Sequence, residues 1–151
     1  MAPKTKDTPL TDSAARLRMG IVRTARRLRQ EAAAEATGLT PTSTAALATI
    51  ERHGPLTPSE LAEIERVKRP TVTRTLGCLE RDGLVERTPD PDDGRSALVA
   101  VNAAGRERLR RLRGRKNAYL ARRMRDMSAA DVEALERAAE ILERMLEDER
   151  G

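Results

Sequence analysis

The sequence predicts a mainly α-helical protein that carries one small β-hairpin. Three observations lead to this fold class. Apolar residues recur at three- and four-residue spacing along most of the chain, which is typical of amphipathic helices. Only residues 84–88 and 97–101 read as strands, and a turn rich in Pro, Asp and Gly separates them. The chain has one Tyr and no Phe or Trp, so its core must be built from aliphatic residues that mostly favour helices.

The composition favours one compact unit with an anionic partner. With 151 residues the chain is long enough for one shared core and short for two. The net charge of +5 favours nucleic acid, although an acidic protein would also fit it. A single cysteine, Cys78, excludes an intramolecular disulfide, and the first residues have no apolar signal-peptide core, so we expect a cytoplasmic protein. No apolar run is long enough for a membrane span.

The chain is expected to begin with an arm and a long helix. Residues 1–10 have no periodicity, which predicts a flexible arm. The first helix is expected within 11–38, with Thr11 or Asp12 as its N-cap and Gly38 as its C-terminal stop. Its apolar stripe consists of Ala14, Leu17, Ile21, Ala25, Leu28 and Ala32.

Two short helices follow. The second begins with Thr40 as a polar cap before Pro41 and ends at the break made by Gly54 and Pro55. The third opens with a capping box, in which Glu60 stands three residues after Thr57.

The fourth helix starts at Arg69 and Pro70, ends at Asp82 and Gly83, and buries an apolar face made of Val72, Leu76 and Leu79. The two strands come directly after it, with residues 89–96 as their turn. Asn102 then caps a fifth helix, and Ser128 with Asp131 forms a capping box for a sixth. The sixth helix has a coiled-coil-like seam of Val132, Leu135, Ala139, Leu142 and Leu146.

Residues 40–101 have the element order of a winged helix-turn-helix. A short helix, a brief turn and a second helix are followed at once by a hairpin, and in such domains the second helix enters the major groove of DNA. The start of that helix is polar and basic here: Lys68, Arg69, Pro70, Thr71, Thr73 and Arg74.

Each of these residue types has a use at a DNA surface. Arg69 or Arg74 can donate paired hydrogen bonds to guanine, and Lys68 can neutralise a phosphate. The two threonines can offer a hydroxyl or a methyl group to a base edge. In isolation these residues fit a capped, solvated helix start equally well, and it is the hairpin that favours DNA reading.

The turn of the hairpin, PDPDDGRS at residues 89–96, carries an arginine. Arg95 can reach the minor groove beside the site, where narrow A·T-rich DNA attracts arginine. Asp93 is expected to brace this loop by pairing with a nearby basic side chain.

Together these motifs resemble the core of the MarR family of bacterial regulators (multiple antibiotic resistance regulators). The resemblance rests on Leu61-Ala62, on Thr71-Val72-Thr73-Arg74, on LERDGLV at residues 79–85 and on Asp93-Gly94-Arg95. Flanking helices of the expected kind extend it over nearly the whole chain, apart from the N-terminal arm.

The resemblance implies a set of roles. Residues 69–74 would read the major groove, Arg95 would enter the minor groove, and Thr40 and Thr42 would contact phosphates. The helical regions 11–38 and 103–150 would interlock two copies into a dimer. A small-molecule effector, of unknown identity, would release the DNA. We therefore expect a homodimeric repressor of double-stranded DNA with a pseudo-palindromic operator, because a two-fold axis places two reading helices about one DNA turn apart.

Two positions depart from the family's pattern. Gly77 and Cys78 replace a charged pair, often Asp-Arg, so one phosphate contact is missing and the glycine weakens the helix by about 1 kcal/mol relative to alanine. Val101 and Asn102 replace the more usual Leu-Thr, but Asn is an equally good cap.

The last two helices carry opposite charge. Residues 106–125 contain ten basic side chains and one acidic one, whereas residues 126–150 contain nine acidic and three basic. This opposition predicts that the two helices pair, within one chain or between two copies. The alternatives are two solvated faces without a preferred partner, or a DNA footprint that extends onto residues 106–111.

No motif indicates an enzyme or a cofactor. No nucleophile–base pair or phosphate-cradling glycine loop is present, and His53 has no second His or Cys near it in sequence. We expect Cys78 to be an inert, half-buried thiol rather than a redox sensor. The remaining alternative is a winged-helix protein-interaction module, which would keep its partner when Arg69, Thr73 and Arg95 are changed.

Overall fold

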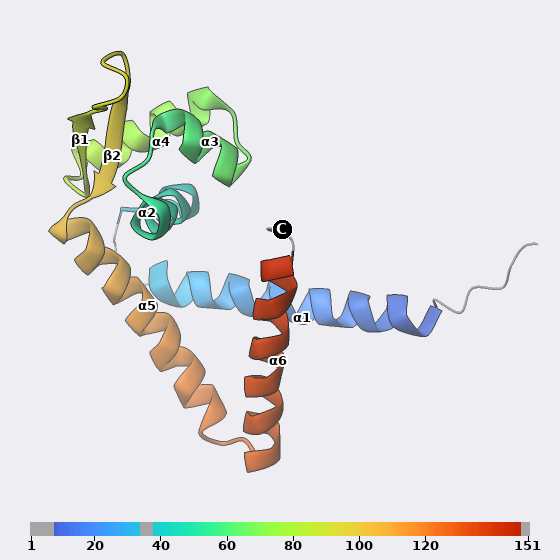
Figure 1. Ribbon diagram of the computed structural model, residues 1–151. Helices are drawn as coiled ribbons and strands as arrows, with labels where there is room; N and C mark the ends of the chain where they lie inside the picture. The colour runs from blue at the N-terminus through green and yellow to red at the C-terminus, as the bar shows by residue number, and fades with distance from the viewer. Residues whose placement is uncertain (1–7, 34–37, 149–151) are drawn as a thin grey trace, which may run out of the picture. The chain divides into compact units, whose positions relative to one another are not determined.

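The computed structural model describes residues 8–33 and 38–148 of the chain. It divides the protein into two compact units, one up to Lys116 and the other from Asn117. The mainly α-helical class with one hairpin is confirmed. The elements over these residues are α1 Thr8–Ala33, α2 Pro41–His53, α3 Pro58–Glu65, α4 Arg69–Arg81, β1 Val85–Pro89, β2 Ala97–Val101, α5 Ala103–Met124 and α6 Ala129–Asp148 (Figure 1).

The predicted caps of α2 and α3 are confirmed. The Thr40 hydroxyl accepts a hydrogen bond from the Ser43 amide at 3.1 Å. At α3 the Thr57 amide donates to Glu60 Oε2 at 2.8 Å, and the Glu60 amide donates to Thr57 Oγ1 at 3.2 Å. The bonds from Thr57 hold the pKa of Glu60 below its ordinary value. The capping box therefore stabilises α3 at neutral pH. This contribution is complete above the ordinary pKa of glutamate and is lost as the pH falls from there through the lowered pKa of Glu60.

One apolar core joins the helices of the first unit to the hairpin. Val72, Leu76 and Leu79 of α4 are buried as predicted, and Leu76 and Leu79 have 0% of their surface exposed. They belong to the same cluster as Leu47 of α2 and Val99 of β2. Because α4 packs against α2, α3 and β1, its buried face is held on several sides.

A third segment, at Leu56, pairs with the hairpin, and this pairing was not predicted from the sequence. β1 and β2 pair antiparallel, from Val85 opposite Val101 to Pro89 opposite Ala97. Leu56 pairs with Val99 from outside these strands, through Leu56 N to Val99 O at 3.0 Å and Val99 N to Leu56 O at 2.8 Å. This bridge ties the chain just before α3 to the hairpin.

The end of α4 is connected to the start of α5 by hydrogen bonds. Gly83 takes the left-handed conformation, with φ of +69°, and lets the Leu84 amide donate to Leu79 O at 2.9 Å. Leu84 therefore belongs to the helix end, and the strand starts one residue later than expected. The Asn102 side chain donates to Gly83 O at 2.7 Å and accepts from the Gly105 amide at 2.9 Å. Its predicted cap is confirmed, and the same side chain also holds the turn after α4.

The prediction of a flexible arm over residues 1–10 is wrong for residues 8–10, the last three. Residues 8–10 are helical. The helix can include Pro9 because a proline in the first turn costs no intrahelical N–H hydrogen bond. Thr11 and Asp12 lie inside the helix and are not its cap. Residues 1–7 lie outside the described part of the chain, as do 34–37, where the helix was expected to continue towards Gly38.

The second unit contains the end of α5 and all of α6. The Asp131 amide donates to Ser128 Oγ at 3.1 Å, and this hydroxyl donates to Asp131 Oδ2 at 2.8 Å, which confirms the predicted cap. Much of the apolar seam of α6 faces solvent, since Leu135 is 45% exposed and Leu146 is 60% exposed. None of the helices in the described residues is long and apolar enough to cross a membrane.

Replacing Gly105 with alanine should destabilise the fold. A Cβ there would lie 2.2 Å from Leu84 O and 2.7 Å from Val101 Cγ1, so α5 could not approach the hairpin as closely. We expect Gly105→Ala to cost roughly 1–3 kcal/mol in chemical denaturation. The matched control is Gly114→Ala in the same helix, whose added Cβ meets nothing within 4 Å. It should stabilise the protein by about 0.5–1 kcal/mol. Equal effects of both substitutions would contradict the close contact at Gly105.

Candidate nucleic-acid interface

The structure brings the six predicted DNA-reading residues together at the start of α4. Lys68, Arg69, Pro70, Thr71, Thr73 and Arg74 are all exposed. Lys68 is the N-cap residue, and no side chain caps the helix. The opposite face of α4 is buried in the core, and this burial fixes the orientation of the helix, so that the basic face stays exposed. The geometry therefore presents a polar, basic helix start on a fixed support.

Arg69 and Thr73 are partly engaged within the protein. The Arg69 guanidinium donates to the hydroxyl of Ser59 on α3, which anchors it across the turn between the two helices. The Thr73 hydroxyl donates to Arg69 O at 3.1 Å, leaving its methyl group and its acceptor capacity for a ligand. Among the described residues, the Arg74 guanidinium has no such partner. Of the two arginines, Arg74 is the one whose guanidinium donors are not engaged by a described side chain.

The loop of the wing is braced by aspartates. Asp93 Oδ1 accepts a hydrogen bond from the Arg95 amide at 3.0 Å, and Asp90 Oδ1 accepts one from the Asp92 amide at 2.9 Å. Asp93 thus braces the loop through a backbone N–H, whereas pairing with a basic side chain was expected. The contribution of Asp90 was missed, although an aspartate two residues before a turn amide is a known signal for this bond. The exposed Arg95 side chain is left on a short, tied loop.

Thr40 and Thr42 lie at the N-terminus of α2. The Thr40 hydroxyl is committed to its cap, because it accepts from the Ser43 amide and donates to Ser43 Oγ at 3.0 Å. Thr42 lies in the first turn with its side chain exposed. The two predicted phosphate contacts therefore differ, and Thr42 is the one whose hydroxyl is not used by the cap.

The exposed face of α4 continues beyond Arg74. Helical spacing places Gly77, Cys78 and Arg81 one and two turns after it on the same face. The Arg81 guanidinium lies 3.2 Å from Cys78 Sγ, and the thiol is half-buried, as expected. Arg81 was missed as a candidate, although its position seven residues after Arg74 was a signal for it.

An ion pair connects α4 to the wing. Glu80, near the end of α4, accepts a hydrogen bond from Arg87 of β1. Since both side chains are substantially exposed, we assign this pair little stability by itself. Its consequence is geometric, because it joins the helix and the hairpin at their outer surfaces.

Several arginines of α5 have acidic or backbone partners inside the chain. Arg106 donates to Val101 O at 2.8 Å, and Arg113 pairs with Glu51 of α2 at 2.5 Å. Arg110 and Arg111 both bind Glu107. These bonds favour a structural use of residues 106–113 over an extension of the DNA footprint.

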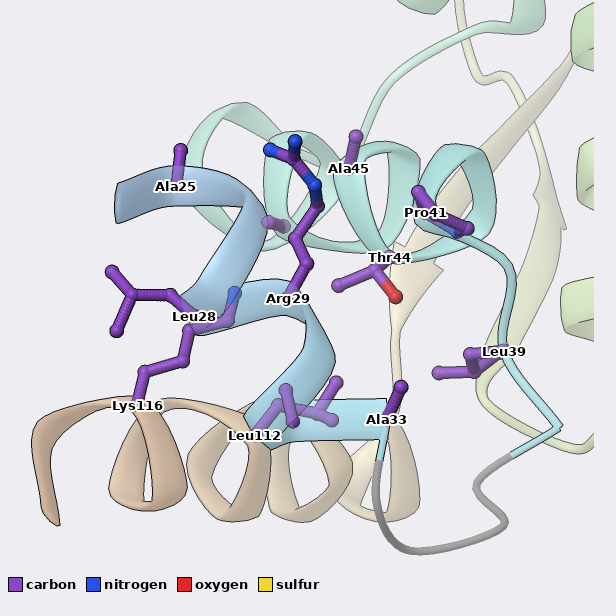
Figure 2. A pocket seen from close by; sticks show the side chains of 12 residues that line it. Ala25, Leu28, Arg29, Ala33, Leu39, Pro41, Thr44, Ala45, Leu112 and Lys116 are labelled. Carbon is purple, nitrogen blue, oxygen red and sulfur yellow. The ribbon is translucent and has the colours of Figure 1, made fainter. Parts of the chain in front are cut away.

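A cavity of about 380 Å³ lies within the first unit, between α1, α2 and α5. Figure 2 shows its lining side chains, which are mostly small and aliphatic, with Arg29 of α1 and Lys116 of α5 as the cationic members. The full lining is Ala25, Leu28, Arg29, Ala32, Ala33, Leu39, Pro41, Thr44, Ala45, Ala48, Leu112 and Lys116. The sequence did not reveal this cavity, because it is formed where three separate helices meet.

His53 is exposed at the end of α2, and no group of three potential metal ligands occurs among the described residues.

Comparisons of sequence identify the family. The MarR family model matches residues 39–97, which span α2 to the wing. An HTH-type transcriptional regulator of Mycobacterium bovis is 34% identical over 137 residues, covering 88% of this chain and 94% of that protein. An HTH-type transcriptional repressor of Pseudomonas putida, IacR, is 26% identical over 98 residues, covering 65% of this chain and 59% of that protein.

Solved structures share the fold. A transcriptional regulator of Pseudomonas aeruginosa aligns with a TM-score of 0.80 and 31% identity, covering 92% of this chain and 96% of that one. A mutant of MepR from S. aureus, solved bound to an oligodeoxyribonucleotide, aligns with a TM-score of 0.67 and 20% identity, covering 90% of this chain and 96% of that one. The arrangement of α4 and the wing agrees with these matches, and the chain belongs to the MarR family of DNA-binding transcriptional regulators.

Proposed function

We propose that the protein is a homodimeric repressor that reads a pseudo-palindromic operator through the outward face of α4 and through Arg95. The observation that carries this proposal is the division of α4 into a buried apolar face and an exposed basic one, beside a wing with an exposed arginine. A mutant of MepR, a protein of the same fold, was solved bound to an oligodeoxyribonucleotide, which supports DNA as the ligand.

Each side chain then has a role that follows from its surroundings. Arg74 donates two parallel hydrogen bonds to O6 and N7 of a guanine, and Thr71 and Thr73 contact neighbouring base edges. Lys68 binds a phosphate at the uncapped N-terminus of α4, where the helix dipole favours negative charge. Arg69 positions the start of α4 through Ser59 and contributes charge towards the backbone. Pro70 fixes how the helix enters the groove.

The phosphate contacts at α2 and the wing complete the footprint. Thr42 binds a phosphate at the N-terminus of α2. Thr40 caps the same helix and so positions Thr42 for this contact. Arg95 enters the minor groove beside the α4 contacts, held in place by Asp93. Phosphate contacts fix the orientation of the protein on DNA, and the base contacts supply the sequence preference.

The exposed apolar faces of α1 and α6 support the homodimer. Leu17, Ile21 and Val22 of α1 are exposed, as are Leu135 and Leu146 of α6. The charges of the two helices are complementary, because α1 carries six arginines and two acidic residues, and α6 carries seven acidic residues and two arginines. We propose that α1 of one copy packs with α6 of the other, which buries both seams and pairs opposite charges.

Repression is compatible with where such a dimer would sit, and the analogy with a relative selects it. A dimer that covers two successive major grooves excludes other proteins from the same DNA. IacR, the relative from Pseudomonas putida, is a transcriptional repressor, which supports this direction of regulation.

The cavity between α1, α2 and α5 is the proposed effector site. Its aliphatic walls suit an apolar ligand body, and Arg29 and Lys116 suit a single negative charge. We therefore propose an aliphatic carboxylate as the class of effector. Binding weakens DNA affinity only to the extent that the ligand prefers the conformation that does not fit the operator.

The DNA proposal is tested by selecting bound sequences from a random duplex pool at about 150 mM salt, using the wild type and Arg95→Ala. We expect an inverted repeat with half-sites about 10 base pairs apart. Arg95→Ala should bind that repeat roughly tenfold more weakly, and its base preference should be lost only at the flanking positions of the repeat. Arg137→Ala is the matched control, because it removes the same charge from the polar face of α6.

Two outcomes are decisive. An inverted repeat weakened by Arg95→Ala alone supports the proposal. Recovery of no motif, with weak and equal binding by all three proteins, would favour the protein-interaction module instead.

The dimer proposal predicts that Leu135→Glu yields a monomer. A carboxylate in the α6 seam cannot be buried without a partner, so its desolvation opposes association. Analytical ultracentrifugation should show a dimer for the wild type and a monomer for this variant. Arg137→Glu, on the opposite face of the same helix, changes the charge by more and should remain dimeric. A wild type that sediments as a monomer at micromolar concentration refutes the proposal.

The effector proposal predicts that octanoate releases operator DNA and that octanol, which has no charge, does so far less. Removing the Arg29 charge by Arg29→Gln should weaken the octanoate response at least roughly tenfold without changing DNA affinity in its absence. Fluorescence anisotropy of labelled operator measures both. If octanol and octanoate act equally, or if Arg29→Gln responds like the wild type, the carboxylate assignment is wrong.

A further inference from the structure

Gly77 is a glycine that the folded protein itself does not require. It lies in the interior of α4, where glycine is the least favourable residue after proline. Its φ is not positive. Apart from its chain neighbours and the nearby backbone of α4, a Cβ built at this position would meet no heavy atom of the described residues within 4 Å. Alanine would therefore fit the helix and stabilise it. The reason for a glycine must be sought outside the packing of this chain.

Gly105, which is buried, shows what a glycine with a close neighbour does inside the protein. A Cβ there would lie 2.2 Å from Leu84 O, so the missing side chain lets two segments of backbone meet. At Gly77 the corresponding space is open. It is available to a ligand that approaches the helix as closely as Leu84 approaches α5.

The surroundings of Gly77 indicate which ligand this is. Gly77 follows Arg74 by three residues and precedes Arg81 by four, so it lies between two arginines on one face of the helix. Cys78 beside it is small, and its sulfur is 3.2 Å from the Arg81 guanidinium. The result is a shallow notch on a basic helix surface, whose walls attract a polyanion and whose floor is backbone.

We infer that Gly77 is the point of closest approach between α4 and DNA, and that its missing side chain determines how deeply the helix lies in the major groove. This inference rests on the proposed DNA-reading function of α4. The notch accommodates a base-pair edge, while Arg74 and Arg81 contact the groove on either side. Depth in the groove controls which base edges Arg74 and Thr73 reach, so Gly77 is a specificity residue although it has no side chain.

The inference predicts that stability and DNA binding change in opposite directions. Gly77→Ala should raise the melting temperature by about 2–4 °C, because it improves helix propensity without meeting any neighbour. The same methyl group should weaken binding to the selected operator at least roughly tenfold. Loss of binding by a variant that is more stable cannot be caused by unfolding.

Two further variants control for helix propensity and for charge. Gly114→Ala lies in open space on α5 and should raise the melting temperature similarly while leaving operator binding within about twofold of the wild type. Gly77→Lys adds a positive charge, which would tighten binding if the position were away from the groove. The inference requires that Gly77→Lys bind the operator more weakly than the wild type.

The experiment measures operator binding by fluorescence anisotropy and thermal unfolding for the wild type and these three variants. Weaker binding by Gly77→Ala and Gly77→Lys, with normal binding by Gly114→Ala, supports the inference. If the wild type selects an operator that Gly77→Ala binds equally well or that Gly77→Lys binds more tightly, this inference is overturned and the proposed function stands. If the wild type selects no operator, the proposed function fails and the inference fails with it.

Discussion

The apolar core around Leu76 and Leu79 fixes which face of α4 is turned to solvent. These two fully buried residues of α4 share one cluster with Leu47 of α2 and Val99 of β2. A helix held on one face by such a core exposes a definite opposite face, because its residues advance by a fixed rotation. The core therefore does more than stabilise the fold. Because of this core, Arg74, Gly77 and Arg81 lie together on the face of α4 that is turned away from the core.

Connections at the edges of this core align the wing with the helix. Gly83 ends α4 and turns the chain into β1, and Asn102 joins the same turn to the start of α5. Leu56 pairs with Val99 on the other side of the hairpin, and Glu80 binds Arg87 at the surface. These connections hold the wing beside α4, as the proposed joint reading of DNA by Arg74 and Arg95 requires. A loose wing would add charge but little positional preference.

Local chemistry explains which parts of the fold were predictable from sequence. Thr40, Thr57 and Asn102 cap helices through residues within three positions, and the period of Val72, Leu76 and Leu79 marks the buried face directly. Features made by distant residues were missed, including the Leu56 bridge, the bond from Arg69 to Ser59 and the cavity with Arg29 and Lys116. The exposed face of α4 was predictable from its helical period, but the different surroundings of Arg69 and Arg74 depend on a tertiary contact. The early start of α1 was missed because residues 8–10 show no helical periodicity of their own.

We propose that α4 reads the major groove while Arg95 enters the minor groove of the same site. Dimethyl sulfate tests both at once, since it methylates guanine N7 in the major groove and adenine N3 in the minor groove. When the wild type is bound to its operator, we expect N7 protection inside each half-site and N3 protection at the flanks. In Arg95→Ala only the N3 protection should be lost. Protection that is absent from the major groove, or that disappears from both grooves together in Arg95→Ala, would contradict it.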